Sequence, residues 1–212
     1  MIVQKQTFQL AQLPLLCGRT LKDVRVGYET YGRLSERGDN AILITHYFSG
    51  TSHAAGRFFE SDVEPGYWDS IIGPGKAIDT DRYFVVSADT LTNVNVKMRH
   101  VVTTGPASLD AQTGRPYGST FPVVTIGDFV NVQKALCDAL GITRLHAVAG
   151  PSLGAMQALE WAARYPKHVQ RVIAVVPPGL SIEPYLSAMV DLWCAPILAD
   201  AAWQGGDYYG RT

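Results

Sequence analysis

The sequence is short of cysteine, of net charge and of long apolar runs, and each shortage excludes a class of protein. Only three of its 212 residues are cysteines, at wide spacing, which fits neither a disulfide framework nor a cysteine-rich zinc site. Eighteen basic and nineteen acidic residues leave a net charge of -1, which gives no electrostatic reason to bind nucleic acid or an anionic membrane. No stretch of about 18 apolar residues occurs, so no transmembrane helix is expected.

Signals for secretion are also missing. The N-terminus lacks the apolar core of a signal peptide, and none of the four asparagines begins an Asn-x-Ser/Thr sequon. We therefore expect a cytoplasmic protein in which Cys17, Cys137 and Cys194 are free, buried thiols. What the sequence does have is 47% hydrophobic and 17% charged residues, the balance of a globular chain with a sizeable core, and its length favours a single domain.

Apolar runs and alternation predict a sheet with helices between its later strands. The expected strands are residues 8–10, 24–31, 41–46, 83–88, 145–149 and 169–176. Residues 128–140 place apolar side chains at helical spacing and stop at Gly141, which is a good C-terminal signal. The polar segment 90–118 is predicted to be a long loop. This order predicts an α/β fold, a mostly parallel sheet flanked by helices.

The strongest local signal is Gly150-Pro151-Ser152-Leu153-Gly154, a G-x-S-x-G motif between an apolar strand and a helical pattern that ends at Tyr165-Pro166. This context is typical of a nucleophile elbow, where the flanking positions are glycine because a side chain there would collide with a neighbouring strand or helix. The alternative is an ordinary turn in which Ser152 only caps the helix. The strand, turn and helix in register favour Ser152 as a catalytic nucleophile.

A serine nucleophile needs a histidine base oriented by a carboxylate, and in this type of fold both follow the serine in the chain. Only His168 follows Ser152. It comes after the elbow helix, at the end remote from the serine, about 20 Å away at 1.5 Å per residue, and is a poor candidate. We infer that the chain is truncated or that the missing half is another polypeptide.

A second signal is His46-Tyr47-Phe48-Ser49-Gly50, directly after the apolar run that begins at residue 41. In elbow enzymes the turn after this strand supplies one backbone N–H to the oxyanion hole, and the residue after the nucleophile supplies the other. We expect Phe48 and Leu153 to be these donors. As an alternative, His46 is only a polar strand end.

The candidate motifs for cofactor and metal binding are incomplete. Gly73-Pro74-Gly75-Lys76 resembles the end of a phosphate-binding loop, but Ser70 and Ala77 stand where that motif needs Gly and Ser or Thr. His46, His53 and Asp62 lack the spacing of metal ligands. We therefore expect no bound cofactor and no metal.

Taken together, the motifs resemble those of the homoserine O-acetyltransferase family of α/β-hydrolases. The matching segments, in family order, are residues 46–56, 68–84, 104–108, 121–126, 150–161 and 205–209. The resemblance implies an α/β-hydrolase fold, with residues 1–180 as the N-terminal part of the core and residues 181–212 as the start of a helical lid. It also implies Ser152 as nucleophile, Phe48 and Leu153 as oxyanion donors, and a catalytic Asp and His beyond Thr212.

The implied reaction is transfer of an acetyl group from acetyl-CoA, a substrate here, through an acetyl-enzyme to a hydroxyl acceptor. Family members typically read Gly-Gly-Ser-Met-Gly-Gly where this chain has Gly150 to Ala155, and Tyr47 and Phe48 are bulky. One rival function is therefore a carboxylesterase that hydrolyses short-chain acetate esters. Another, of a different class, is a non-catalytic α/β binding domain. The expected partners are an acyl donor and a hydroxyl acceptor or water, with no nucleic acid or membrane, and a homodimer through the lid is one option.

Overall fold

The computed structural model describes residues 1–177 and 184–209. Its strands are β1 (Gln6–Pro14), β2 (Thr20–Tyr31), β3 (Ala41–Ile44), β4 (Ile72–Gly73), β5 (Ile78–Asp79), β6 (Phe84–Ala88), β7 (Leu145–Pro151) and β8 (Val172–Val175). The helices are α1 (Ile126–Ala139), α2 (Leu153–Arg164) and α3 (Pro184–Ala199), with short 3-10 helices η1 (Gly118–Thr120) and η2 (Ala201–Gly206). All predicted strands and both predicted helices are present, and the predicted loop at residues 90–118 contains no helix or strand apart from Gly118, which begins η1.

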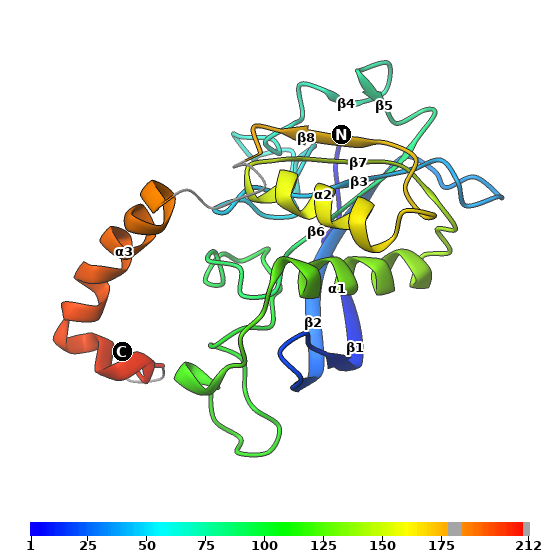
Figure 1. The fold of residues 1–212 in the computed structure, drawn as a ribbon. Helices are drawn as coiled ribbons and strands as arrows, with labels where there is room; N and C mark the ends of the chain where they lie inside the picture. Colours follow the sequence, from blue (N-terminus) through cyan, green and yellow to red (C-terminus); the bar gives the residue numbers. More distant parts are fainter. Residues whose placement is uncertain (178–183, 210–212) are drawn as a thin grey trace.

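Six strands form one sheet in the order β1-β2-β6-β3-β7-β8. The pairs β1 with β2 and β2 with β6 are antiparallel, whereas β6, β3, β7 and β8 run parallel to one another. This confirms the predicted mostly parallel sheet. Parallel neighbours end at the same edge of a sheet, so the loop after β3 and the turn after β7 lie beside each other (Figure 1).

The sheet is covered on both faces. Side chains alternate along β3, so Ala41 and Leu43 pack with α1 and α2, while Ile42 and Ile44 pack on the opposite face. Figure 1 shows α1 and α2 side by side across one face. The opposite face is covered by the segment from Ala54 to Ile78. All four residues of β3 are therefore buried, which explains why the run reads as continuously apolar.

Element boundaries differ from the predicted ones where local contacts decide them. The helix α1 begins two residues early because the Asp128 carboxylate accepts hydrogen bonds from the Thr125 amide, at 2.8 Å, and from its hydroxyl, at 2.9 Å. Strand β8 is shorter than predicted, and Val169 takes part only in an isolated bridge to Leu145. The two-residue strands β4 and β5 were not predicted, because such short elements carry no periodicity.

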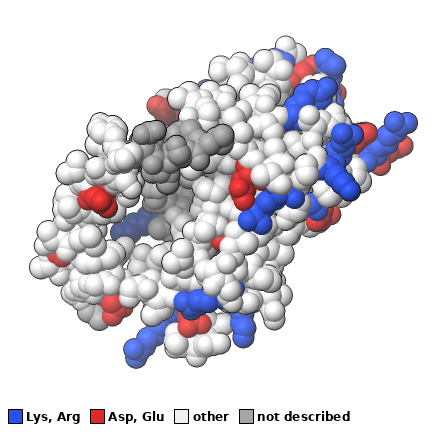
Figure 2. Space-filling view, in the orientation of Figure 1, with Lys and Arg blue, Asp and Glu red and all other residues white. Residues whose placement is uncertain are grey.

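The helix α3 stands apart from the sheet (Figure 1). It exposes large apolar side chains, among them Tyr185, Leu192, Trp193 and Ile197, and its side of the molecule carries few charges (Figure 2). The boundary predicted between residues 180 and 181 lies outside the described residues. Among the described residues no helix is long and apolar enough to cross a membrane.

The three cysteines are free, but the expectation that all are buried was wrong for two of them. Cys137 lies on the buried side of α1, whereas Cys17, in the turn between β1 and β2, and Cys194, on α3, are exposed. An isolated cysteine carries no pattern that tells a core position from a turn or an uncovered helix.

Candidate active site

Ser152 occupies a strained turn between β7 and α2. Its backbone has φ 52° and ψ -118°, a left-handed conformation that side-chain-bearing residues rarely adopt and that is found at functional sites. The side chain is exposed and makes no capping hydrogen bond, which argues against the interpretation of Ser152 as an ordinary helix cap. The Ser152 amide donates to the Val175 carbonyl of β8 at 3.0 Å, so the sheet itself fixes the turn.

The glycines on either side of Ser152 are required by the end of β3. A Cβ atom on Gly150 would collide with the Thr45 hydroxyl and carbonyl, and one on Gly154 would lie 2.8 Å from the Thr45 carbonyl carbon and 3.0 Å from the His46 carbonyl oxygen. The Thr45 hydroxyl donates to the Gly154 carbonyl at 2.8 Å. Sequence reasoning missed Thr45, although a polar residue at the end of a buried apolar run was a usable signal.

Phe48 and Leu153 each present a backbone N–H at this edge of the sheet. Phe48 lies in the loop after β3 and Leu153 opens α2, and β3 and β7 are paired neighbours. Among the described residues, neither amide has a hydrogen-bond acceptor. Two backbone donors without a partner in the described part of the chain thus follow neighbouring parallel strands, at the edge of the sheet where the exposed Ser152 lies, and an oxyanion hole requires two such donors.

The loop from His46 to Gly50 is clamped by the long segment after β6. Asn93, which is buried, donates to the Gly50 carbonyl at 3.0 Å, and Asn95 donates to the Ser49 carbonyl at 2.9 Å. The Asn95 amide in turn donates to the Asn93 side-chain oxygen at 2.8 Å, which fixes the orientation of that amide group. The segment predicted as a long loop thus holds the candidate oxyanion loop in place.

No histidine of the described residues hydrogen-bonds to the Ser152 hydroxyl. The His168 carbonyl accepts from the Leu145 amide at 2.7 Å, at the start of β7, whereas Ser152 follows the end of that strand. Ser152 is seven residues further along the chain than Leu145, about 23 Å at about 3.3 Å per residue in a strand. The other four histidines contact other groups: His46 the Tyr47 carbonyl, His53 the Glu29 carboxylate, His100 the Phe58 ring and His146 the Arg171 guanidinium.

A buried ionic cluster supports the same edge of the sheet. The Lys5 ammonium lies 2.8 Å from Glu29 and 3.6 Å from Asp89, and both carboxylates are fully enclosed. Asp89 also accepts from the amides of Ser52, at 2.7 Å, and Val102, at 3.0 Å. The cluster fastens two loops to the sheet, and sequence reasoning missed it because its members come from distant segments.

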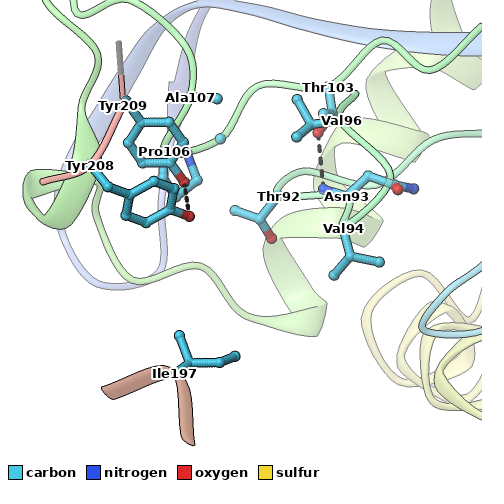
Figure 3. Close-up of a pocket in the computed structure, with 11 residues that line it drawn as sticks. Thr92, Asn93, Val94, Val96, Thr103, Pro106, Ala107, Ile197, Tyr208 and Tyr209 are labelled. Carbon is cyan, nitrogen blue, oxygen red and sulfur yellow. Dashed lines mark hydrogen bonds between the residues drawn. The ribbon is translucent and has the colours of Figure 1, made fainter. Parts of the chain in front are cut away.

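A pocket of about 460 Å³ lies between the long loop and the C-terminal segment. In Figure 3 the Tyr208 and Tyr209 rings lie on one side, Asn93 and Val94 on another, and Ile197 reaches toward them from α3. The two tyrosine hydroxyls lie 3.2 Å apart, and burial together with Tyr208 raises the pKa of Tyr209 to about 12. No charged residue of the described part of the chain lines this pocket, and Asn93 links it to the loop that carries Phe48.

Comparison with known proteins agrees with this geometry. A family model described as alpha/beta hydrolase fold matches residues 68–211. The chain is 50% identical over 192 residues to a homoserine O-acetyltransferase of Methanococcoides burtonii, a match that covers 91% of this chain and 38% of the relative. The chain spans about half the length, or less, of the curated relatives it matches.

Solved structures give the same picture. Esterase E22 superposes with a TM-score of 0.95 at 52% identity, covering 99% of this chain and 57% of the esterase. Homoserine O-acetyltransferase from Bacillus anthracis superposes with a TM-score of 0.94 at 47% identity, covering 100% of this chain and 56% of that enzyme. Both a transferase and an esterase therefore share this arrangement of strands and helices.

Proposed function

We propose, from the premise that this chain belongs to the α/β-hydrolase fold family, that it carries the serine nucleophile of an acyltransferase that resembles homoserine O-acetyltransferase. The observation that carries the proposal is the backbone of Ser152, at φ 52° between two glycines whose Cβ atoms would collide with the end of β3. A strained, exposed serine without a capping bond has no structural role that would maintain it.

In the proposed reaction, the Ser152 oxygen attacks the carbonyl carbon of an acetyl thioester, and its proton passes to a general base. The carbonyl oxygen becomes an oxyanion, which the amides of Phe48 and Leu153 stabilise. Collapse of this intermediate breaks the carbon–sulfur bond, and the departing thiolate of CoA takes up a proton. A hydroxyl acceptor then attacks the carbonyl carbon of the acetyl-serine, and its proton passes to the same base. The bond between that carbon and the Ser152 oxygen breaks, Ser152 takes the proton back from the base, and the ester product leaves. Acetyl-CoA is thus a substrate and not a bound cofactor.

The acid and base are proposed to come from polypeptide outside residues 1–212, as a continuation of the chain or as a second chain. In support, the described histidines are engaged away from Ser152, and β8 exposes Ile173 (48%) and Val175 (39%) at the edge of the sheet, an apolar surface that further elements could cover. A structure of the complete protein should place an outside histidine within hydrogen-bond reach of the Ser152 hydroxyl. Finding His168 there would overturn this assignment.

Serine chemistry is tested with the complete protein and a matched pair of variants. Ser152→Ala should abolish acetyl transfer and labelling by a serine-directed phosphonate, with an unchanged melting curve, because only an exposed hydroxyl is removed. Ser70→Ala is the control, since Ser70 is also exposed and should leave both readouts unchanged. Turnover retained in Ser152→Ala would refute the proposal.

The second candidate function is hydrolysis of short-chain acetate esters, which the likeness to esterase E22 favours. A transferase acceptor must outcompete water at about 55 M, which requires a pocket that fixes it in place. Homoserine carries a carboxylate and an ammonium, yet the side chains of Tyr47, Phe48 and Leu153 near the elbow offer no charge. We therefore expect some ester hydrolysis beside transfer.

The two enzymatic functions are separated by what attacks the acyl-enzyme. The complete protein is incubated with a chromogenic acetate ester, with and without homoserine, and separately with acetyl-CoA and homoserine. Absence of acetate release in the incubation without homoserine would remove the esterase function. Absence of acetylhomoserine from acetyl-CoA would remove the transferase function.

Assembly and location are proposed on separate grounds. The apolar side chains of Leu192 (64% exposed) and Trp193 (62%) on α3 support a homodimer formed through the lid, and Trp193→Asp should shift the protein to monomer in analytical ultracentrifugation. The three free thiols support a cytoplasmic location.

A purified species of about 23 kDa with no second chain and no activity would favour the non-catalytic binding domain instead.

A further inference from the structure

The peptide that joins Tyr47 to Phe48 is held from its carbonyl side. The Tyr47 carbonyl accepts one hydrogen bond from the Gly50 amide at 2.9 Å and lies 2.7 Å from the His46 Nδ1 atom. In a trans peptide the C=O and the following N–H point in opposite directions. Fixing the Tyr47 carbonyl therefore directs the Phe48 N–H the other way, and this N–H has no acceptor among the described residues.

Both nitrogens of the His46 ring lie within hydrogen-bonding distance of other groups. A carbonyl can only accept, so Nδ1 must carry the proton that is shared with Tyr47. The Thr90 amide donates to Nε2 at 3.3 Å, and the Asn93 side-chain nitrogen lies 3.4 Å from the same atom. Because both of these groups are donors, Nε2 must be the acceptor. The contacts specify one tautomer of an uncharged ring, protonated at Nδ1.

The surroundings of His46 agree with this state. The ring is completely buried, and burial lowers its pKa, an effect that Lys5 reinforces and that the Tyr47 carbonyl and the Asp89 carboxylate oppose. The contacts of Nε2 come from a segment 44 to 47 residues away in the chain. The ring therefore bridges the candidate oxyanion loop and the long loop after β6.

We propose that His46 is a positioning residue for the oxyanion hole: its Nδ1–H, held by the contacts of Nε2 with Thr90 and Asn93, sets the direction of the Phe48 amide. His46 touches no reacting atom and acts only through the peptide between residues 47 and 48. The proposal rests on the proposed serine acyl transfer, and it assigns to His46 a role other than that of the base or of a polar strand end.

Two substitutions of His46 test the roles of its two ring nitrogens separately. Asparagine places an amide nitrogen near the position of Nδ1 and keeps a donor for Tyr47, whereas glutamine reaches the position of Nε2 and loses that donor. In the complete protein, His46→Gln should lower kcat about 10- to 100-fold with KM within twofold, since loss of a whole oxyanion donor lowers kcat about 10²- to 10³-fold. His46→Asn should retain at least tenfold more kcat than His46→Gln. A matched control, His146→Gln, near the opposite end of β7, should change kcat less than twofold.

The outcomes distinguish this proposal from the proposed function. If Ser152→Ala is inactive but His46→Gln and His46→Asn have equal kcat, or if KM rises in step with the fall in kcat, the positioning role is wrong and the serine mechanism stands. If Ser152→Ala retains activity, the proposed function itself fails. The melting temperature of each His46 variant is measured first. Activities are then compared at a temperature below the melting temperature of the less stable variant.

A measurement on the unsubstituted protein covers the case in which the variants do not fold. Nitrogen NMR of protein labelled with ¹⁵N-histidine reports which ring nitrogen carries the proton. At pH 7 we expect one buried histidine that is protonated at Nδ1 and unprotonated at Nε2. A proton on Nε2 of every neutral histidine would overturn the proposal, because the Tyr47 carbonyl would then have no donor from His46.

Discussion

Replacing Ser152 with glycine should make the fold more stable while it removes the proposed nucleophile. A residue with a side chain at φ 52° and ψ -118° stores about 1–3 kcal/mol of backbone strain, and glycine adopts this region without strain. Glycine also loosens the unfolded chain, which lowers stability by about 0.4–1 kcal/mol. The Ser152 side chain is exposed and makes no capping bond, so little else is lost. Ser152→Gly should therefore be more stable than Ser152→Ala by about 1 kcal/mol.

The assay is urea unfolding of both variants at equal concentration, supported by thermal melts, in which 1 kcal/mol corresponds to about 2–4 °C for a chain of this size. Ser70 supplies the control pair, because it is exposed and is not among the residues with positive φ. There the order should reverse, with Ser70→Gly less stable than Ser70→Ala. If Ser152→Gly is no more stable than Ser152→Ala, the strain attributed to the elbow does not exist.

Three further outcomes are expected. Gly154→Ala should lower the free energy of unfolding by about 1–3 kcal/mol, because the added Cβ would lie 2.8 Å from the Thr45 carbonyl carbon. The same change should abolish phosphonate labelling of Ser152, and labelling at the wild-type level would contradict this. Lys5→Met should lower the free energy of unfolding by about 3–5 kcal/mol in urea titration, because the enclosed Glu29 and Asp89 carboxylates would lose the ammonium that lies 2.8 and 3.6 Å from them. A loss below about 1 kcal/mol would show that this ammonium is not needed. Burial raises the pKa of the Cys137 thiol to about 12, so a thiol reagent at pH 8 should add two labels by mass spectrometry to the folded protein and three to the unfolded one.

Features with local signatures were predictable from the sequence. The buried strands β3, β6 and β7 read as continuous apolar runs because both of their faces pack against other elements. The elbow was equally local, since strand, glycine, serine, glycine and helix follow one another without interruption. The start of α1 was placed two residues late, because the Thr125–Asp128 cap was not read, and β4 and β5 were too short to show a period.

The position of Ser152 on a strand-to-helix turn was thus determined by the sequence alone, because adjacent residues specify it. Only the tertiary structure decided why its neighbours must be glycine, since the Thr45 carbonyl that excludes a side chain comes from β3, more than a hundred residues earlier. The exposure of Cys17 and Cys194, the enclosure of Glu29 and the contacts of His46 with Thr90 and Asn93 were decided in the same way. Hydrogen bonding and burial depend on contacts between segments that are distant in the sequence. A local pattern of neighbouring residues does not specify which distant segments come into contact.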